Sequence, residues 1–332
     1  VKKPFVELFR AMGKQGTPPQ ILIASLAALS YALFSAASAK QEMLEVLPEG
    51  SKLRGAVERY RDACQRSPRL SAVRALSTAL TLLWAQSVRL HNVSIVDIFW
   101  SVSFVISSMA YSAHSEATKH AFNGRKILVN GLTGAWACRL ATYLWWRNHV
   151  SAHGIGEGDS LEDFRYQNFR RYWDRKGLSY WWFSLLQVFG LQGVLSFVVS
   201  APLQAAMTRP QPQHFTFLDL AGTLSWAIGY VFEHAGDLTL TAFKSNPANK
   251  GTVLAQGLWA FTRHPNYFGN AMMWWGIWLI ACATEGGWKS FYGPLLMNYL
   301  LTNVSGAKLL EKTMRRTKPG FALYMDNTPE FV

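Results

Sequence analysis

The chain has 332 residues, of which half are hydrophobic and only 16% are charged, and it contains fourteen tryptophans. This composition is typical of a membrane protein. The net charge of +13 does not indicate a nucleic-acid partner, because the lysines and arginines lie mostly between apolar segments and not in one basic tract. The three cysteines are scattered and odd in number, which gives neither a disulfide framework nor the spacing of a metal site.

Long apolar stretches predict an all-α polytopic membrane protein, a bundle of about seven to eight transmembrane helices with one amphipathic interfacial helix. The stretches lie near 21–39, 72–90, 93–112, 127–146, 180–206, 215–234, 270–284 and 289–304. The last two are short for a bilayer, and 72–90 carries Arg74 and Arg89 near its ends, so tight packing or partial re-entry is expected there. Residues 1–90 are the expected N-terminal extension with one or two transmembrane helices, followed by a transmembrane domain over 91–332.

With eight spans, the N-terminus, the loops 147–179 and 235–269 and the C-terminal tail share one side of the membrane. That side holds most of the cations, so it is the expected cytosolic or matrix side. Segment 40–71 lies opposite, mixes acidic with basic residues and predicts a surface helix. The expected localisation is multi-pass, in the endoplasmic reticulum or mitochondrial inner membrane, or in a bacterial inner membrane. The first residues give no signal peptide.

The stretch 127–146 contains a charged residue at a depth where charge is costly. At helical spacing, Trp136, Arg139, Tyr143 and Arg147 share one face. An arginine within a membrane span costs roughly 2.5–3.5 kcal/mol, so Arg139 is expected to face the protein interior or a polar cavity. Asp97 enters from the same side and is a candidate partner for Arg139, either as a structural ion pair or as part of a site.

The segment after 149 contains Gly154, Gly156 and Gly158, which imitate part of a dinucleotide-binding fingerprint. No strand precedes them, and the neighbouring acids Glu157 and Asp159 would repel a pyrophosphate, so that interpretation is rejected.

The next residues, LEDFRYQNFRRYW, predict an amphipathic surface helix with arginines at headgroup level. Three aromatic side chains are available for the lipid boundary: Phe164, Phe169 and Trp173. A ligand clamp made by Glu162, Asp163 and Arg165 is the alternative.

The sixth apolar stretch leads into a line of polar side chains. Glu233, Asp237, Thr241 and Lys244 follow one another at steps of four, four and three, which predicts one stripe at the end of a helix. The stripe is either a solvated helix end or a set of carboxylates and a lysine that meets a ribose, an amide or a phosphate.

The stretch GLWAFTRHPNYFGNAMMWWG predicts a helix that begins at His264–Pro265, since proline suits the first helical position. Unpaired N–H groups at that start, together with Arg263 and His264, favour a phosphate. Asn266 and Asn270 share one face of the helix. A membrane-interface anchor is the other interpretation, but it does not require two asparagines on one face.

These residues resemble the steroid 5α-reductase superfamily, in particular its bacterial and protist branch of little-characterised membrane proteins. The resemblance covers roughly residues 93 to 332. Isoprenylcysteine carboxyl methyltransferase is a more distantly similar protein. It is carried by VDIFWSVSFV, CRLATYLWWR, EDFRY, FGLQGVLSFVVSAPL, FEHAGDLTLTAFKSNPANKG, GLWAFTRHPNYFGNAMMWWG, VSGAKLLEKTMRR and YMDNTPEF. It implies a bundle of about seven transmembrane helices that encloses NADPH in its C-terminal half and admits a lipid-like enone.

The resemblance also implies the cofactor ligands. They are Asp237, Lys244, Arg263, His264, Asn266, Tyr267, Asn270, Glu311, Arg315 and Arg316. Position 270 departs from the family pattern, which has glutamate there, and the acid and tyrosine that polarise the substrate ketone in steroid reductases have no match in the N-terminal half. Asp97 and Tyr267 are the remaining catalytic candidates.

The function expected from the resemblance is NADPH-dependent reduction of a conjugated double bond in a steroid-like or other lipid substrate within the membrane. A catalytically impaired scaffold, serving as an accessory subunit of a larger membrane complex, is one alternative. An S-adenosylmethionine-dependent membrane methyltransferase is the other, because such enzymes share the Arg-His-Pro-x-Tyr-x-Gly turn. The expected partners are membrane lipids, a hydrophobic lipid-like substrate and other membrane-complex subunits, without nucleic acid or metal.

Overall fold

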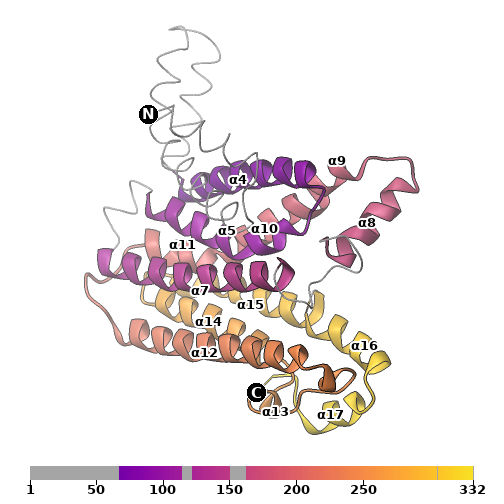
Figure 1. Cartoon of the computed structure of the whole chain (residues 1–332). Helices are drawn as coiled ribbons and strands as arrows, with labels where there is room; N and C mark the ends of the chain where they lie inside the picture. Colours follow the sequence, from indigo (N-terminus) through magenta and orange to yellow (C-terminus); the bar gives the residue numbers. More distant parts are fainter. Residues whose placement is uncertain (1–66, 114–121, 150–161, 305, 332) are drawn as a thin grey trace. The chain divides into compact units, whose positions relative to one another are not determined.

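The computed structural model describes residues 67–113, 122–149, 162–304 and 306–331, which all belong to one compact unit, residues 65–332 (Figure 1). Every regular element in these ranges is a helix, in agreement with the all-α prediction. The apolar stretch 21–39, most of segment 40–71 and the glycine-rich run at 154–158 lie outside the described residues.

The helices follow the apolar stretches of the sequence closely. The first half contains α4 (Pro68–Leu90), α5 (Ile95–Ser112), α7 (Asn123–His149), α8 (Phe164–Asp174), α9 (Tyr180–Ser184), the π-helix η1 (Leu185–Gly190), α10 (Leu191–Val199) and α11 (Ala201–Thr208). The second half contains α12 (Phe217–Ser245), η2 (Pro247–Asn249), α13 (Leu258–Phe261), α14 (Pro265–Cys282), η3 (Gly287–Phe291), α15 (Tyr292–Tyr299), η4 (Leu300–Val304), α16 (Ala307–Thr317) and α17 (Phe321–Asn327).

The apolar stretch 180–206 is one run in the sequence but not one helix in the structure. It is divided among α9, η1, α10 and α11, and the last division falls at Ser200, where ψ is 1°. Pro202 lies in the first turn of α11. Because proline has no N–H to donate and suits the first turn of a helix, the chain ends one helix and starts another here.

Two helical runs in the described part are long and apolar enough to cross a membrane, Ile95–Ser112 and Tyr180–Val199. The other long helices carry more charge or, like the uncharged α14, are less apolar on average. Helix α7 contains Arg125, Lys126, Arg139 and Arg147. The larger number of spans inferred from the sequence therefore stays a prediction.

Helices α12 and α14 approach each other so closely that side chains would not fit between them. A Cβ on Gly229 would lie 2.5 Å from the carbonyl oxygen of Gly269, and a Cβ on Gly276 would lie 2.5 Å from that of Gly222. Small residues permit this kind of backbone approach. The contact aligns the second half of α12 with the first turns of α14.

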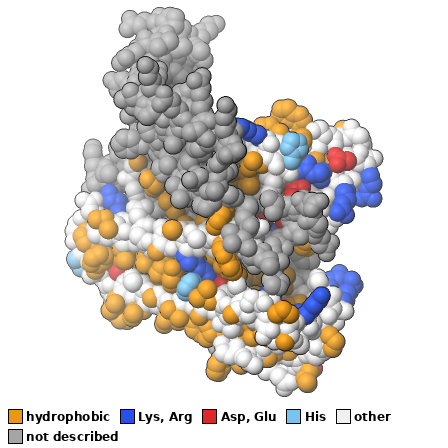
Figure 2. Space-filling view, in the orientation of Figure 1, with side chains coloured by type: hydrophobic (Ala, Val, Ile, Leu, Met, Phe, Trp, Pro, Cys, Tyr) orange, Lys and Arg blue, Asp and Glu red, His pale blue; other side chains and the backbone are white. Residues whose placement is uncertain are grey.

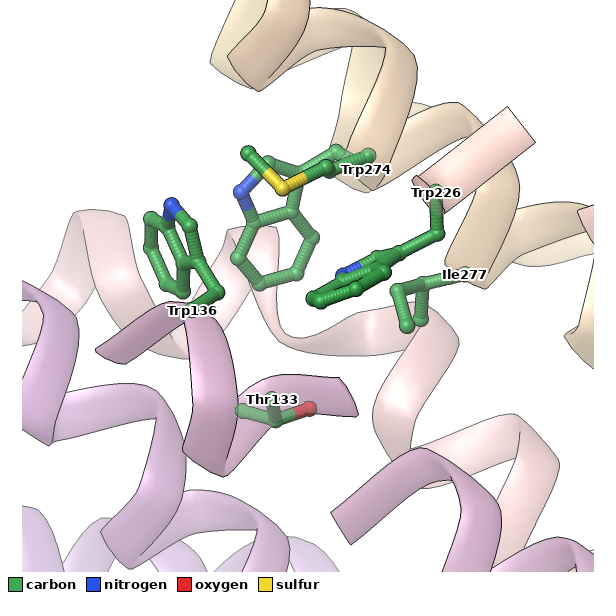
Figure 3. Close-up of a pocket in the computed structure, with 6 residues that line it drawn as sticks. Thr133, Trp136, Trp226, Trp274 and Ile277 are labelled. Atoms are coloured by element: carbon green, nitrogen blue, oxygen red, sulfur yellow. The ribbon is translucent and has the colours of Figure 1, made fainter. Parts of the chain in front are cut away.

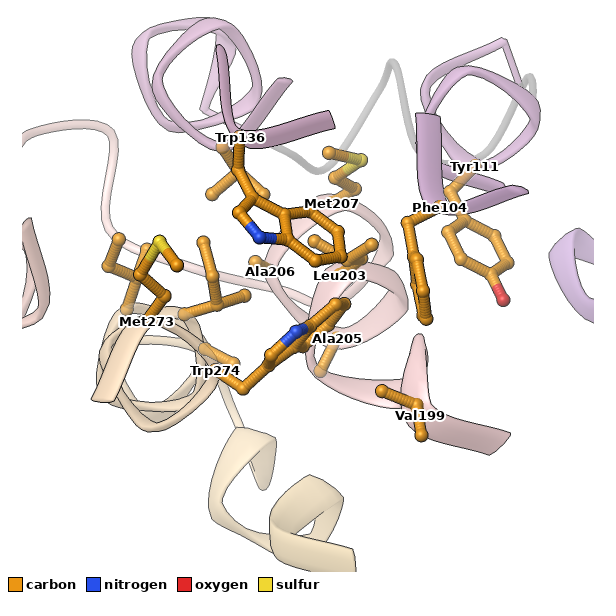
Figure 4. Close-up of a cluster of buried hydrophobic side chains, with 14 of the residues drawn as sticks. Phe104, Tyr111, Trp136, Val199, Leu203, Ala205, Ala206, Met207, Met273 and Trp274 are labelled. Carbon is orange, nitrogen blue, oxygen red and sulfur yellow. The ribbon is translucent and has the colours of Figure 1, made fainter. Parts of the chain in front are cut away.

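An aromatic cluster joins α5, α7 and α14 in the centre of the unit (Figure 4). The ring centroids of Phe104 and Trp274 are 4.6 Å apart, and Trp136 lies 5.6 Å from each of them. Leu203 and Met207 from α11 are fully buried beside these rings. The cluster fixes Trp136 and Trp274, which both border the polar site described below.

A buried ion pair ties the first turn of α7 to the start of α12. The fully buried Arg125 donates from Nε and Nη2 to the two oxygens of Asp219, at 2.6 and 2.7 Å. Asp219 also accepts from the backbone N–H of Thr216 and completes a capping box at the helix start. The pair therefore fixes the register of α7 against α12.

The outer side of α12 is apolar. Its exposed residues Phe217, Leu220, Leu224, Ile228, Val231 and Leu238 recur at helical spacing. Figure 2 shows hydrophobic side chains widely distributed over this face of the molecule. A large exposed apolar face marks a surface that meets lipid or another protein.

Candidate functional site

Three polar contacts between helices α7 and α12 lie one above another, and we call these three contacts the polar ladder. Trp136 Nε1 donates to Glu233 Oε2 at 3.0 Å, and Arg139 Nη2 donates to Asp237 Oδ2 at 2.5 Å. The hydroxyl groups of Tyr143 and Thr241 are 3.4 Å apart. The two polar faces expected from helical spacing in these helices therefore face each other.

One arginine serves two carboxylates in the ladder. Besides Asp237, Arg139 lies 3.5 Å from Glu233 Oε1, and its side chain is 8% exposed against 6% for each acid. Burying an arginine and two acidic side chains is costly unless they are paired and hydrogen-bonded. Arg139 itself and donors from a third helix supply most of these pairing and hydrogen-bonding partners.

The third helix is α14, which contributes its two asparagines. Asn266 Nδ2 donates to Asp237 Oδ1 at 3.0 Å, and Asn270 Nδ2 donates to Glu233 Oε1 at 3.2 Å. The close contact of α12 with α14 allows amides one helical turn apart to meet carboxylates one helical turn apart. The structure thus brings together Asp237, Asn266 and Asn270 from the predicted cofactor ligands, with Glu233 beside Asn270.

The predicted pairing of Asp97 with Arg139 is wrong. Asp97 instead accepts from Arg165 Nη2 at 2.7 Å and from the Tyr166 hydroxyl at 2.6 Å, both in α8. Helix α7 presents a different face to α5, where the Ser101 hydroxyl donates to the carbonyl of Ala137. Arg139 points toward α12, and Asp97 fastens α8 to the first turn of α5.

Helix α14 begins at Pro265, as predicted from the proline. His264 precedes it, and its ring stacks on that of Tyr267 with centroids 5.4 Å apart and planes 11° from parallel. This contact orients the tyrosine at the helix start, next to Asn266.

The charged groups of the Arg-His pair have partners within the chain. Arg263 Nε donates to Glu311 Oε1 at 2.7 Å, and His264 Nε2 lies 3.0 Å from the same oxygen. Arg263 Nη1 also donates to the carbonyl oxygens of Met325 and Thr328. Burial lowers the pKa of His264, and Glu311 offsets this only in part. Glu311 is thus brought to Arg263 and His264 as a structural partner of the turn.

The C-terminal segment is fastened to the same turn. The backbone N–H of Arg263 donates to Pro329 O at 2.9 Å, and the Thr262 hydroxyl donates to Glu330 O at 2.7 Å. The Tyr324 hydroxyl in α17 donates to Trp259 O, and burial raises the pKa of Tyr324 to about 12. The residues that precede α14 are therefore held in place by a segment more than 50 residues later in the chain.

Cations gather where α7 and α12 end. Lys244 follows Thr241 by one turn of α12, and Arg147 follows Tyr143 by one turn of α7. Desolvation lowers the pKa of the Lys244 ammonium, and the positive charges of Arg147 and Lys318 lower it further. Lys318 Nζ donates to Thr252 O at 2.7 Å. Among the described residues, none of the three cations forms an ion pair.

Arg315 and Arg316 are not brought to the polar ladder by any contact among the described residues. Both are exposed in the last turn of α16. The buried face of that helix presents Glu311, which meets Arg263 and His264. These two arginines therefore remain peripheral to the site in this structure.

Buried polar atoms without a hydrogen-bond partner mark the interior of the site within the described part of the chain. They include Oδ1 of Asn270, Nη1 of Arg139 and the hydroxyl of Thr133. Thr133 borders a cavity of about 10 Å³, which is about the space of one water molecule. Figure 3 shows its other walls, among them Trp136, Trp226 and Trp274.

Three groups that the structure places in or near the site, Trp136, Glu233 and Lys318, were not among the predicted cofactor ligands. Trp136 and Glu233 were recognised on polar faces, but their hydrogen bond needs the register between α7 and α12. Lys318 lies far along the chain and gave no signal beyond its charge.

The chain was compared with known proteins and protein families. A family model described as "Protein of unknown function (DUF1295)" matches residues 83–328, from the last part of α4 to just beyond the end of α17. No curated protein and no solved structure matched. The matched range includes the whole polar ladder, both asparagines of α14 and Glu311. Because the match spans most of its length, the chain belongs to the DUF1295 family.

Proposed function

We propose that this protein is a membrane-embedded, NADPH-dependent reductase of a conjugated double bond in a steroid-like or other lipid substrate. The observation that carries the proposal is the buried network of Arg139, Asp237, Glu233 and the two α14 asparagines. Its resemblance to the steroid 5α-reductase superfamily supports the same assignment. A buried network that retains unpartnered atoms is suited to bind a polar group of a ligand.

The chemistry of the unpartnered atoms fits a nicotinamide. Asn270 Oδ1 is an acceptor without a hydrogen bond, and Arg139 Nη1 is a donor that makes no hydrogen bond although it lies 3.5 Å from Glu233 Oε1; a carboxamide offers one group of each kind. Asn266 and Asp237 are next to them and would bind the adjoining polar groups. Lys244, Arg147 and Lys318 would hold phosphates, because three cations without ion pairs in the described structure favour an anion.

When bound, NADPH would supply a hydride to the β-carbon of a conjugated enone. The chain's task is to exclude water and to stabilise the negative charge that develops on the enone oxygen. Trp136 and Trp274 provide apolar walls on one side of the network. Tyr267 is our candidate proton donor, because a tyrosine hydroxyl is protonated near neutral pH and Tyr267 stands at the start of α14 next to Asn266.

We further propose that the protein crosses the membrane several times, with α12 among the spans. The exposed apolar side of α12 supports this, because its polar residues face α7 and α14 and its outer side is left to contact lipid. The cation-rich end would then face the cytosol or the mitochondrial matrix. Compartments that fit are the endoplasmic reticulum, the mitochondrial inner membrane and a bacterial inner membrane.

A non-catalytic scaffold is the second candidate, and one observation favours it. Glu311 satisfies Arg263 and His264 together, so the turn that looked ready for a phosphate is held by the chain's own carboxylate. In this alternative the protein serves as a subunit of a larger membrane complex.

Ligand-induced thermal stabilisation of the purified protein tests the proposal. NADPH should raise the unfolding temperature, with about 2.7 kcal/mol of stabilisation at about a hundredfold excess over the dissociation constant. Lys244→Ala and Asn266→Ala should reduce the effect, whereas Lys250→Ala, an exposed lysine just beyond α12, should retain it. A shift with S-adenosylmethionine alone would replace the reductase by a methyltransferase, and no shift with NADPH, NADH or the methyl donor would favour the scaffold.

A further inference from the structure

Helix α8 contains three arginines, and a fourth follows directly after its last residue. The four divide into two pairs with different surroundings. Arg165 and Arg170 point inward and have carboxylate partners. Arg165 contacts Asp97 and Asp163 at 2.7 and 2.9 Å, and Arg170 contacts Glu162 at 2.9 Å. Their positive charge is thus used to fasten the helix to the rest of the unit.

Arg171 and Arg175 form the other pair and are exposed. Arg171 donates only to Gln167 in its own helix, at 3.2 Å, and Arg175 donates to the carbonyl of Arg171, at 3.1 Å, among the contacts of the described residues. With Asn168 and Asp174 they line a shallow groove on the surface. Neither guanidinium has an ion pair in the part of the chain that the structure describes.

The groove lies on a face that also carries aromatic side chains. Phe164, Asn168, Arg171 and Arg175 follow one another at steps of four, three and four, which places them along one line of the helix. Phe164 is 54% exposed and Tyr172 is 46% exposed. Apolar rings interleaved with cations are the pattern of a helix that lies in a membrane interface.

The position of α8 gives this face a specific neighbour. The backbone N–H of Asp163, at the start of α8, donates to the Ser94 hydroxyl at 2.6 Å, directly before the candidate span Ile95–Ser112. The turn after α8 leads to Tyr180, where the second candidate span begins. Both spans therefore start beside α8, which puts the helix at the level where a bilayer surface would lie (Figure 1).

We propose that Arg171 and Arg175 bind the phosphate of an anionic phospholipid headgroup, with Phe164 and Tyr172 beside its acyl chains. Neither arginine of the outward pair forms an ion pair, and although Asp174 also lines the groove, two cations against one carboxylate leave a positive charge that a lipid phosphate neutralises. Asn168 adds an amide donor to the same groove. This assignment is independent of any reductase activity, because the groove shares no residue with the polar ladder.

Native mass spectrometry of the full-length protein in a neutral detergent provides the test. Wild-type protein mixed with phosphatidylglycerol should retain it more tightly than phosphatidylcholine. The double substitution Arg171→Gln and Arg175→Gln should weaken retention of phosphatidylglycerol roughly 30-fold, the effect of two headgroup cations. Lys308→Gln with Lys312→Gln, two exposed cations one turn apart in α16, should leave retention unchanged.

Three outcomes would overturn the proposal. They are equal retention of the two lipids by the wild type, unchanged retention in the arginine variant, and equal losses in the arginine and lysine variants. Glycerol phosphate separates a lipid from a free anion: it should compete only weakly, and competition as strong as that of the lipid would show a soluble-phosphate site instead. Thermal unfolding without lipid should be the same in wild type and in the arginine variant, which excludes misfolding as the cause of a loss.

Discussion

The guanidinium of Arg139 lies 2.5 Å from the carboxyl group of Asp237 and 3.5 Å from that of Glu233, so one buried cation contacts two buried acidic side chains of the neighbouring helix. The remaining stabilisation comes from neutral donors, Trp136 and the two asparagines of α14. Three helices therefore depend on the same pair of carboxylates, and changes at any of them should be felt at the others.

Arg139→Leu should destabilise the protein strongly, because it leaves two buried carboxylates without their cation. We expect the free energy of unfolding to fall by roughly 3–5 kcal/mol, measured by denaturation in detergent. Arg316→Leu removes an exposed arginine and should change the free energy by less than about 0.5 kcal/mol. Combining Arg139→Leu with Asp237→Asn should cost less than the sum of the two single effects. Strict additivity would contradict a direct interaction.

Asn270→Glu is a second substitution with a definite sign. From the sequence alone, restoring glutamate at 270 would be expected to strengthen cofactor binding. In the structure the new carboxylate would stand where an amide now donates to Glu233 at 3.2 Å, and two carboxylates at that distance repel. Asn270→Glu alone should therefore lower the unfolding temperature, and adding Glu233→Gln should restore it. A single variant as stable as wild type would show that Glu233 does not face this position.

Gly229→Ala should disturb the contact between α12 and α14, because its Cβ would lie 2.5 Å from a backbone oxygen of Gly269. Overpacking of this kind typically costs about 1–3 kcal/mol. Gly131→Ala is the matched control, since a Cβ there meets nothing within 4 Å in the middle of α7, and alanine favours a helix. Thermal unfolding of the two variants should shift in opposite directions. Similar losses in both would mean that the close approach is not specific to α12 and α14.

His264 should make stability depend on pH. Burial lowers its pKa in the folded state, so between that value and the ordinary value of about 6.5 the unfolded chain binds a proton that the folded chain does not. Stability should therefore fall as the pH drops below about 6.5, and this contribution should level off below the lowered pKa. His264→Gln should reduce the dependence while retaining an amide near Glu311. Parallel stability curves between about pH 5 and 8 would contradict the assignment.

Much of the fold could be predicted from the sequence because the apolar stretches are long and bounded by polar residues. The start of α14 was predictable to the residue from Pro265, and the polar faces of α7 and α12 followed from helical spacing alone. Helix α8 was also expected, but Trp173 is not free for lipid. Its ring stacks on Phe183 at 3.7 Å, and its indole N–H donates to Gln187.

What could not be predicted were partnerships that depend on how helices rotate against each other. Asp97 and Arg139 enter from the same side, but α7 turns the arginine toward α12, and α8 supplies Asp97 with Arg165. The pairing of Glu311 with Arg263 and His264 joins positions nearly fifty residues apart and rests on the docking of α16 and the C-terminal segment. Neither helical spacing nor composition contains that information.

The ends of α7 and α12 next to the polar ladder both carry positive charge, so the force between the two helices changes sign along their length. Within the unit the two helices attract through Arg139 and the carboxylates, whereas beyond Tyr143 and Thr241 the charges of Arg147 and Lys244 push them apart. A multivalent anion between the two ends would turn this repulsion into attraction, so it would act as a latch that closes the helix pair. Salt should weaken both the repulsion between the helix ends and their attraction through a bound anion. The separation of the helix ends should therefore depend on ionic strength.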